Sequence, residues 1–468
     1  MSYETAIANM YSLGHELSQT PSNKFDLAHM RVLLGALGNP QERFPGVLIA
    51  GTNGKGSTAA TLASILVASG LETGLYTSPH LVRINERIRV NHEEISDDDF
   101  CALHDLVERT AERLGSQGEL PWHPSFFEML TAIAFEHFTR ANVDIAVLEV
   151  GMGGRLDATN VIEPKVSVIT DISLDHQKYL GNTVSEIARE KAGIIRRGRL
   201  VVTLPQHPAA NDVIGNVILE LGATGVSAVL YVPPVSPASE QYFGANQDSK
   251  ASDAAGYVSR YPLLVMGEQI EVVTPLVGRH QLRNVALAIA AAEELGKQGV
   301  RGITPNSIER GIRETRWPGR FQAVPAADDA PEFVFDVAHN PAGAWALRST
   351  LSAIYEGRPF IFIFGAMRDK AIAEMAEILF PLAERVIATQ AENPRSATPE
   401  EIRQAARRLT IDIEEAPDVA AALARARALA PPKGVVVVTG SIYIVGEAMR
   451  LLGAGIWQKV PLRKTTQF

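Results

Sequence analysis

Residues 47–58 read VLIAGTNGKGST, an apolar run followed by a glycine-rich turn that carries one lysine. The run at 47–50 predicts a short buried strand, and residues 57–69 predict a helix that Gly70 ends. A glycine-rich turn between a strand and a helix offers backbone N–H groups and the positive end of the helix dipole to an anion. The segment therefore predicts a phosphate-binding loop that binds ATP.

Two features of this loop qualify the prediction. Lys55 can reach the β- and γ-phosphates, and the hydroxyl of Ser57 or Thr58 can approach a metal ion. The spacing departs from the common G-x-x-x-x-G-K-[ST] pattern, because Ile49 stands at the first glycine position and Gly56 follows the lysine. The alternative is a glycine-rich turn without a ligand. The order of strand, lysine-bearing turn and helix favours the phosphate loop.

Outward from the loop, short apolar runs alternate with helical stretches, which indicates an α/β fold with mostly parallel sheets. Helices are expected at 127–140 and 281–295. The segments that predict strands are 74–77, 143–150, 166–170, 199–203, 333–337, 360–365, 385–389 and 435–440. A chain of 468 residues exceeds the length at which a single hydrophobic core stops growing, so two domains are expected. We expect a P-loop NTPase-like domain at 1–314 and a smaller Rossmann-like domain at 315–468, with an irregular surface excursion at 233–259.

Composition narrows the class of protein. The net charge of −9 argues against general binding to nucleic acid or to anionic membranes. One cysteine, the absence of a signal-peptide pattern and the absence of a long apolar run predict a cytoplasmic protein that does not enter a membrane.

Polar residues follow several of the predicted strands, where α/β sheets bind their ligands. Glu149 ends the run at 143–150 and is a candidate Mg²⁺ ligand, the alternative being a structural carboxylate. The glycine-rich segment 151–157 predicts a loop against a ligand, and His176 lies just past another strand. Lys191 by itself reads as a solvated helical charge. The N-K-x-D pattern at 23–26 precedes the loop, so we attribute it to chance.

In the second half, Asp336 and His339 follow the strand at 333–337, and Arg320 precedes it. A cleft between two α/β domains is a common ligand site. A helix cap from Asn340 and a surface role for Arg320 remain the alternatives.

Seven segments together resemble one family: AGTNGKGST, YTSPHLVRINERI, EVGMGGRLDATN, LDHQKYLG, REKAGI, WPGRF and FDVAHNP. They are similar to the folylpolyglutamate synthase/dihydrofolate synthase family of Mur-ligase-like, ATP-dependent amide ligases. The resemblance extends from about residue 3 to the segment at 440–447, and the passage at 225–260 matches least.

The resemblance implies a role for each matching position. Lys191 would be carbamylated and would hold a second Mg²⁺, and with Lys55 and His339 it would form the catalytic set. The ATP-binding residues would be Thr52, Asn53, Gly54, Lys55, Gly56, Ser57, Asn284, Arg320 and Asp336. The Mg²⁺ ligands would be Ser78, Glu149 and His176. The pterin-type substrate would contact Phe25, Asp26, Leu27, Ser125, Leu156, Asp157 and Ala158; the family often has Thr where this chain has Ser125.

The implied activity is the addition of L-glutamate to dihydropteroate and to tetrahydrofolate by a monomeric enzyme. A monofunctional folylpolyglutamate synthase is the first alternative. A peptidoglycan-building Mur ligase needs an N-terminal UDP-sugar domain, for which the phosphate loop at residue 51 leaves no room. A nucleotide-dependent switch is the third, and it predicts slow hydrolysis without an acceptor.

Overall fold

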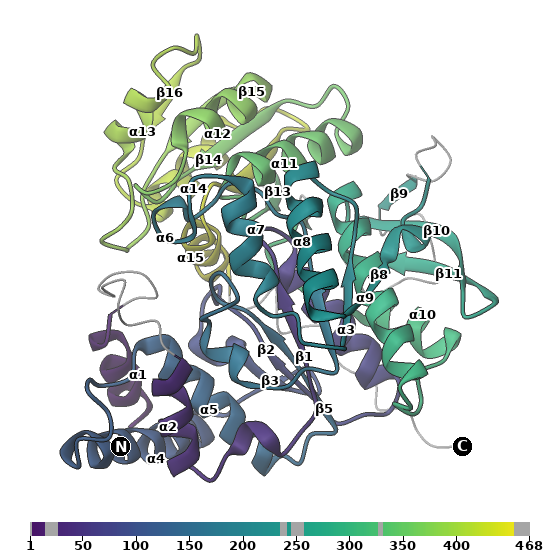
Figure 1. Ribbon diagram of the computed structural model, residues 1–468. Coiled ribbons are helices and arrows are strands. Elements are labelled where there is room, and N and C mark those ends of the chain that lie inside the picture. Colours follow the sequence, from purple (N-terminus) through teal and green to yellow (C-terminus); the bar gives the residue numbers. More distant parts are fainter. Residues whose placement is uncertain (1, 15–26, 235–240, 245–256, 326–330, 454–468) are drawn as a thin grey trace, which may run out of the picture. The chain divides into compact units, whose positions relative to one another are not determined.

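The computed structural model describes residues 2–14, 27–234, 241–244, 257–325 and 331–453 (Figure 1). Contacts divide the chain into two compact units. The first comprises Met1–Pro234, Pro262–Val272 and Gln281–Arg316, and the second comprises Val235–Tyr261, Val273–His280 and Trp317–Phe468. The chain therefore passes between the units for the last time at Arg316–Trp317.

An eight-stranded sheet forms the centre of the first unit, in the order β4-β3-β2-β5-β1-β6-β7-β8. The strands β2, β5, β1, β6, β7 and β8 run parallel, and β3 and β4 are antiparallel additions at one edge. Their bounds are β1 Gly46–Ala50, β2 Thr73–Tyr76, β3 Ile88–Val90, β4 Glu93–Glu94, β5 Ile145–Glu149, β6 Val166–Ile169, β7 Leu200–Thr203 and β8 Thr224–Ser227. The carboxyl ends of six parallel strands thus share one edge of the sheet.

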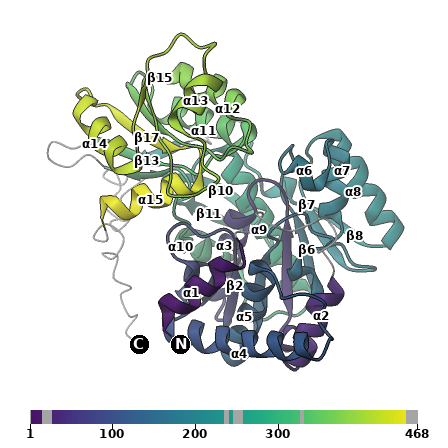
Figure 2. The ribbon, with the colours of Figure 1, turned by 90° about the vertical axis from the view of Figure 1, so that its left-hand side faces the viewer.

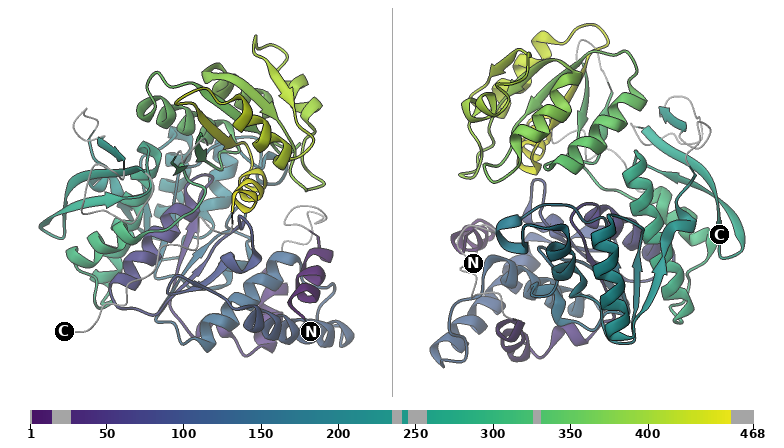
Figure 3. Two further views of the ribbon diagram at one scale, coloured as in Figure 1. Left: turned by 180° about the vertical axis from the view of Figure 1, so that it is seen from behind. Right: turned by 45° about the horizontal axis from the view of Figure 1, so that its top comes forward.

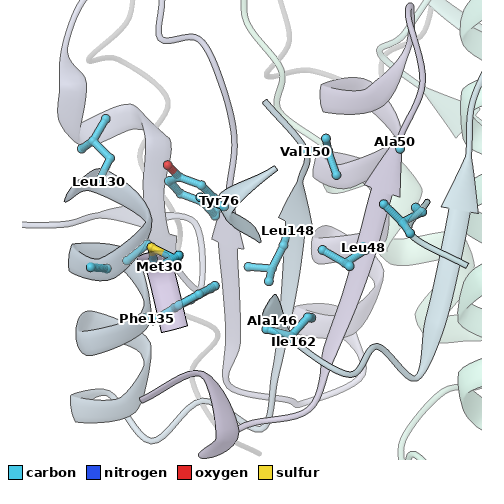
Figure 4. Packing of buried hydrophobic residues seen from close by; sticks show 14 of the residues in the cluster. Met30, Leu48, Ala50, Tyr76, Leu130, Phe135, Ala146, Leu148, Val150 and Ile162 are labelled. Atoms are coloured by element: carbon cyan, nitrogen blue, oxygen red, sulfur yellow. The ribbon is translucent and has the colours of Figure 1, made fainter. Parts of the chain in front are cut away.

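Helices cover both faces of this sheet, which explains why β1 and β5 are buried along their whole length. Leu48 of β1 and Leu148 of β5 lie on the face of the sheet that is covered by Phe135 of α5 and Met30 of α2 (Figure 4). Helices α7 and α8 lie side by side (Figure 3) and contribute to the same core cluster. The helices are α1 Tyr3–Ser12, α2 Leu27–Ala36, α3 Lys55–Ala68, α4 Asp97–Ser116, α5 Phe126–Arg140, α6 Gln177–Leu180, α7 Val184–Ala192, α8 Pro208–Leu221, α9 Arg279–Lys297 and α10 Pro305–Glu314.

The second unit contains a six-stranded sheet in the order β12-β13-β17-β14-β15-β16, in which only β12 pairs antiparallel. Figure 2 shows α14 on one side of β13 and β17, with α11 and α12 on the other. The strands are β12 Gln322–Val324, β13 Glu332–Phe335, β14 Phe360–Phe364, β15 Ala383–Ala388, β16 Ile413–Glu415 and β17 Val435–Thr439. The helices are α11 Pro341–Ile354, α12 Ile372–Leu379, α13 Pro399–Ala405, α14 Val419–Leu429 and α15 Ile442–Leu452.

The predicted α/β class is confirmed, and each strand and helix predicted above overlaps an element of the same type. One expectation needs correction. The stretch 233–259, expected to be irregular, contains β9 (Gln241–Gly244) and the start of β10 (Tyr257–Val265), which pair antiparallel and join β11 (Glu268–Thr274) in a small sheet. The alternation of buried and exposed residues in β10 is clearest after the serine- and alanine-rich stretch, so the sequence hid this strand's start.

No helix among the described residues is long and apolar enough to cross a membrane. Of the two longest, α4 has one buried apolar face, and α9 is buried on all sides over 284–292.

Helix α10 packs against α3, the helix that begins at the phosphate loop. A β-carbon placed on Gly311 of α10 would lie 2.4 Å from the Cα atom of Ile65 in α3. A hydrogen bond also joins the two helices, from the Ser64 side-chain hydroxyl to the Gly311 backbone carbonyl at 2.7 Å. Only glycine permits this approach.

We predict that Gly311→Ala lowers the free energy of unfolding by about 2 kcal/mol, because the added methyl group overpacks the α3–α10 contact. Gly215→Ala in α8 is the matched control, since its β-carbon would have no neighbour within 4 Å. The control should raise stability by about 0.5–1 kcal/mol through helix propensity. Guanidinium unfolding followed by circular dichroism measures both, and equal effects would refute the close-contact explanation.

Candidate functional site

The turn from β1 into α3 is packed too tightly to admit a side chain at either of its two glycines. A β-carbon on Gly51 would lie 1.7 Å from the Thr170 hydroxyl, and one on Gly54 would lie 2.1 Å from the side-chain oxygen of Asn284. Gly54 also has a φ of 88°, a conformation that favours glycine. The backbone N–H groups of Thr52 and Asn53 both donate to the carbonyl of Asp171, at 2.9 and 3.2 Å. Residues just past β6 therefore hold the turn in place.

The hydroxyl groups that follow the turn are buried without protein partners. Neither the Ser57 nor the Thr58 side-chain oxygen has a hydrogen-bond partner, although both residues are buried. Buried hydroxyls are usually hydrogen-bonded, so such a pair at a helix N-terminus fits a phosphate group or its metal ion. Lys55 lies over the same turn, with its Nζ 3.2 Å from the Thr52 carbonyl.

Helix α9 closes on the turn from another direction. Asn284 is buried beside Gly54 and donates to the side chain of Gln281 at 2.9 Å. Its neighbour Arg283 grips the carboxylate of Asp171 with two hydrogen bonds, at 2.6 and 3.1 Å. Sequence reasoning missed Arg283, because its partner lies 112 residues away and no local pattern marks the pair.

Lys191 is the group whose environment differs most from its sequence-based description as a solvated charge. Its side chain is buried, and its Nζ donates to the Gly51 carbonyl at 2.7 Å. Burial, and then the nearby positive charge of Lys55, lower the pKa of the Lys191 amine to about 7. A large fraction of this amine is therefore neutral near pH 7, directly beneath the phosphate loop.

Two of the three predicted metal ligands lie together. The Glu149 carboxylate, buried at the end of β5, accepts the backbone N–H of Ser78 at 3.2 Å. His176 precedes α6 in a left-handed conformation, and its backbone N–H donates to the Asp175 carboxylate. Among the described residues, no group of three or more His, Cys, Asp and Glu side chains could hold a metal ion. The assignment of Ser78, Glu149 and His176 to a metal thus stays a prediction.

The described substrate residues of the prediction lie in one loop and at the starts of three helices. The segment 151–157 is a loop, as predicted, with Leu156 and Asp157 at its end, and Ala158 is the first residue of a short 3-10 helix, Ala158–Val161. Burial raises the pKa of Asp157, which accepts hydrogen bonds from Met152 and Thr159 and so also has a structural role. Leu27 is the first residue of α2 and Ser125 is the N-cap of α5. Phe25 and Asp26 lie outside the described residues.

In the second unit, Asp336 follows β13 and is buried. Burial raises the pKa of Asp336. The charge of Arg320 and the backbone N–H groups of Phe321 and Ala338 partly offset this rise. The Nδ1 atom of His339 donates to the Val337 carbonyl at 3.0 Å. Asn340 caps α11 by accepting the Gly343 N–H, so the cap alternative for that residue is correct.

We predict that Gly54→Ala weakens binding of a non-hydrolysable ATP analogue at least about tenfold, because strain and the clash with Asn284 distort the turn. Gly70→Ala is a matched control: its φ is 83°, close to the 88° of Gly54, but its β-carbon would meet nothing within 4 Å. Calorimetric titration should find the control within about twofold of wild type. Equal losses would show that backbone strain alone, and not the shape of the site, decides binding.

Comparison with known proteins places this geometry in a family. Residues 101–292 match the Mur ligase middle domain, and residues 319–442 match the Mur ligase glutamate ligase domain. A folylpolyglutamate synthase of Lacticaseibacillus casei is 36% identical over 457 residues, covering 97% of this chain and 100% of its own. A dihydrofolate synthase/folylpolyglutamate synthase of Bacillus subtilis is 33% identical over 434 residues, covering 91% and 94%.

A solved structure shares the same architecture over nearly the full length. The Mycobacterium tuberculosis folylpolyglutamate synthase complexed with ADP superposes with a TM-score of 0.83 and 30% identity, covering 97% of this chain and 99% of that one. With this overlap in both sequence and fold, the chain belongs to the folylpolyglutamate synthase/dihydrofolate synthase family of Mur-type ligases.

Proposed function

We propose that this protein is an ATP-dependent ligase that joins L-glutamate to a folate-type acceptor by an amide bond. The observation that carries the proposal is the phosphate loop with Lys191 beneath it. Glycines 51 and 54 leave room only for backbone, two buried hydroxyls lack protein partners, and Lys191, whose pKa is lowered to about 7, donates to the Gly51 carbonyl. This arrangement suits a triphosphate whose γ-phosphoryl group is transferred.

The reaction begins with transfer of the γ-phosphoryl group of ATP to the acceptor carboxylate, which forms an acyl phosphate and ADP. The amino group of L-glutamate then attacks the acyl carbon, loses a proton, and displaces inorganic phosphate. In the first step, the Lys55 ammonium and the N–H groups at the start of α3 stabilise charge on the transferring group. The amine must be unprotonated to attack, so the second step favours neutral to alkaline pH.

Ser57, Ser78 and Glu149 would supply the oxygen ligands that Mg²⁺ prefers, and the His176 imidazole would add one nitrogen ligand. When bound, Mg²⁺ neutralises phosphate charge and orients the γ-phosphoryl group. We further assign Asn284, Arg320 and Asp336 to ATP, His176 to the metal and His339 to positioning of phosphate or the attacking amine. Leu27, Ser125 and residues 156–158 are assigned to the acceptor.

The choice of acceptor is the finer part of the proposal. We propose that both dihydropteroate and tetrahydrofolate are substrates. Support comes from the Bacillus subtilis relative, whose name carries both activities, and from the segment Leu156-Asp157-Ala158. A monofunctional folylpolyglutamate synthase is the second candidate, supported by the name of the Lacticaseibacillus casei relative.

Phosphate release from ATP tests the proposal. We expect release that requires both L-glutamate and an acceptor, with dihydropteroate and with tetrahydrofolate supplied in separate reactions. Release with one acceptor alone would establish a monofunctional enzyme. Release that proceeds equally without acceptor or glutamate would instead favour a nucleotide hydrolase or switch and would refute the ligase.

The state of Lys191 is tested separately. A neutral amine adds to CO₂ to give a carbamate and a proton, so a pKa of about 7 favours this reaction above neutral pH. At a fixed concentration of dissolved CO₂, stimulation of turnover should be full near pH 8. Well below pH 7, carbamate occupancy should fall by up to about a hundredfold for each pH unit, because protonation of the amine and the proton released by the reaction each contribute about a factor of ten.

Lys191→Ala should lose most activity and show no response to CO₂. Its matched control is Lys178→Ala, which removes an exposed lysine of α6 and should respond as wild type does. A Lys191→Ala variant that turns over at the wild-type rate would rule out a carbamylated lysine in the reaction.

A further inference from the structure

Behind Ser125 lies a buried ion pair that no part of the proposed reaction uses. His29 is in the first turn of α2, which begins at Leu27, and Glu128 is in the first turn of α5. The His29 Nδ1 lies 3.1 Å from the Glu128 Oε1, and the exposed fractions of their side chains are 2% and 12%. The pair therefore joins two helix starts that carry assigned acceptor residues.

The surroundings of His29 require both of its ring nitrogens to donate. Its Nε2 lies 2.9 Å from the Trp122 carbonyl, and its Nδ1 faces the Glu128 carboxylate. A carbonyl and a carboxylate are both acceptors, whereas a neutral imidazole has a single N–H. The Trp122 ring also stacks on the imidazole, with centroids 5.1 Å apart and an angle of 17°. This geometry is satisfied by an imidazolium, whose charge the stacked indole favours.

Glu128 in turn determines how the Ser125 hydroxyl is oriented. The Glu128 Oε2 accepts the Ser125 N–H at 2.8 Å and the Ser125 Oγ accepts the Glu128 N–H at 3.4 Å, which forms a capping box. The same Oε2 also accepts the Ser125 hydroxyl at 2.7 Å. Burial by itself would raise the pKa of Glu128, but hydrogen bonds from His29 and Ser125 lower it below its usual value. The carboxylate is therefore ionised, and the Ser125 hydrogen points inward. One lone pair of the hydroxyl accepts the Glu128 N–H, which leaves the other to accept an N–H group of a ligand.

We propose that His29 is a positioning residue for the acceptor substrate, acting through Glu128 on the Ser125 hydroxyl. The proposal rests on the assignment of Ser125 to a folate-type acceptor under the proposed function. Without the donor at position 29, the Glu128 carboxylate can rotate away and the Ser125 hydrogen is free to point outward. The hydroxyl then meets an N–H of the substrate as a donor facing a donor.

Two substitutions distinguish the roles of the Nδ1 and Nε2 atoms of His29. In His29→Asn the amide replaces the Nδ1 donor toward Glu128, and in His29→Gln it replaces the Nε2 donor toward Trp122. We expect His29→Gln to raise KM for dihydropteroate about tenfold, with KM for ATP and L-glutamate within about twofold of wild type. His29→Asn should raise it by about threefold at most. His137→Gln is the matched control. His137 lies in the last turn of α5, the helix that carries Glu128, and its substitution should leave all three KM values unchanged.

A double-mutant cycle tests whether Ser125 is the intermediary. In the Ser125→Ala background, His29→Gln should change KM for the acceptor by less than about twofold, since its target is gone. Independent, multiplicative effects, equal losses for His29→Asn and His29→Gln, or a parallel rise in KM for ATP would each overturn the proposal. Thermal unfolding identifies a variant that fails to fold, and Glu128→Gln then takes the place of His29→Gln in the cycle.

Failure of this proposal differs from failure of the proposed function. A wild-type enzyme that turns over no folate-type acceptor refutes both. An active wild-type enzyme with a multiplicative cycle refutes the role of His29 alone. Selective ¹⁵N-histidine labelling, with His29→Gln for assignment, should find two protonated ring nitrogens for His29 at pH 8; a neutral ring would overturn the proposal regardless of activity.

Discussion

The close packing of the backbone turn at Gly51–Gly54 is the constraint on which the first unit depends. Thr170 after β6, Asn284 in α9 and Lys191 in α7 all contact this turn, and two of these contacts leave no room for a β-carbon. Elements far apart in sequence therefore meet at one short stretch of main chain. The same turn leads into α3, where the buried Ser57 and Thr58 hydroxyls have no protein partner, so the contact that joins the elements also shapes the ligand site.

Buried charge is handled in two ways around the candidate sites. Asp157 and Asp336 are buried at loop positions after β5 and β13, and each accepts backbone N–H groups that offset part of the cost of burial. For Lys191, burial and then the repulsion of Lys55 outweigh the attraction of the Asp175 and Asp157 carboxylates, and its pKa falls to about 7. The surroundings of Lys191 thus favour its neutral, nucleophilic amine, whereas the Asp157 and Asp336 carboxylates are held in structural hydrogen bonds.

Local patterns predicted the central strands β1, β5, β14 and β17, because these strands are buried on both faces and appear as continuous apolar runs. Glu149, Asp336 and His339 were found because they follow such runs. Short or edge strands such as β3, β4, β8 and β16 were not predicted. The start of β10 was missed, since a serine- and alanine-rich stretch precedes it. Arg283 and His29 were also missed. Their partners lie 112 and 99 residues away, and a charged residue on a helix looks solvated until its partner is known.

By itself, the sequence determined the α/β class, the phosphate loop and, through seven motifs, the ligase family. These features depend on local periodicity, turn chemistry and residue identity, all of which are encoded over a few neighbouring positions. Only the tertiary structure decided that Lys191 is buried against Gly51, that Ser57 and Thr58 lack protein partners, and that the two ring nitrogens of His29 face a carboxylate and a carbonyl. Burial and hydrogen-bond geometry set ionisation, and both arise when distant segments pack together.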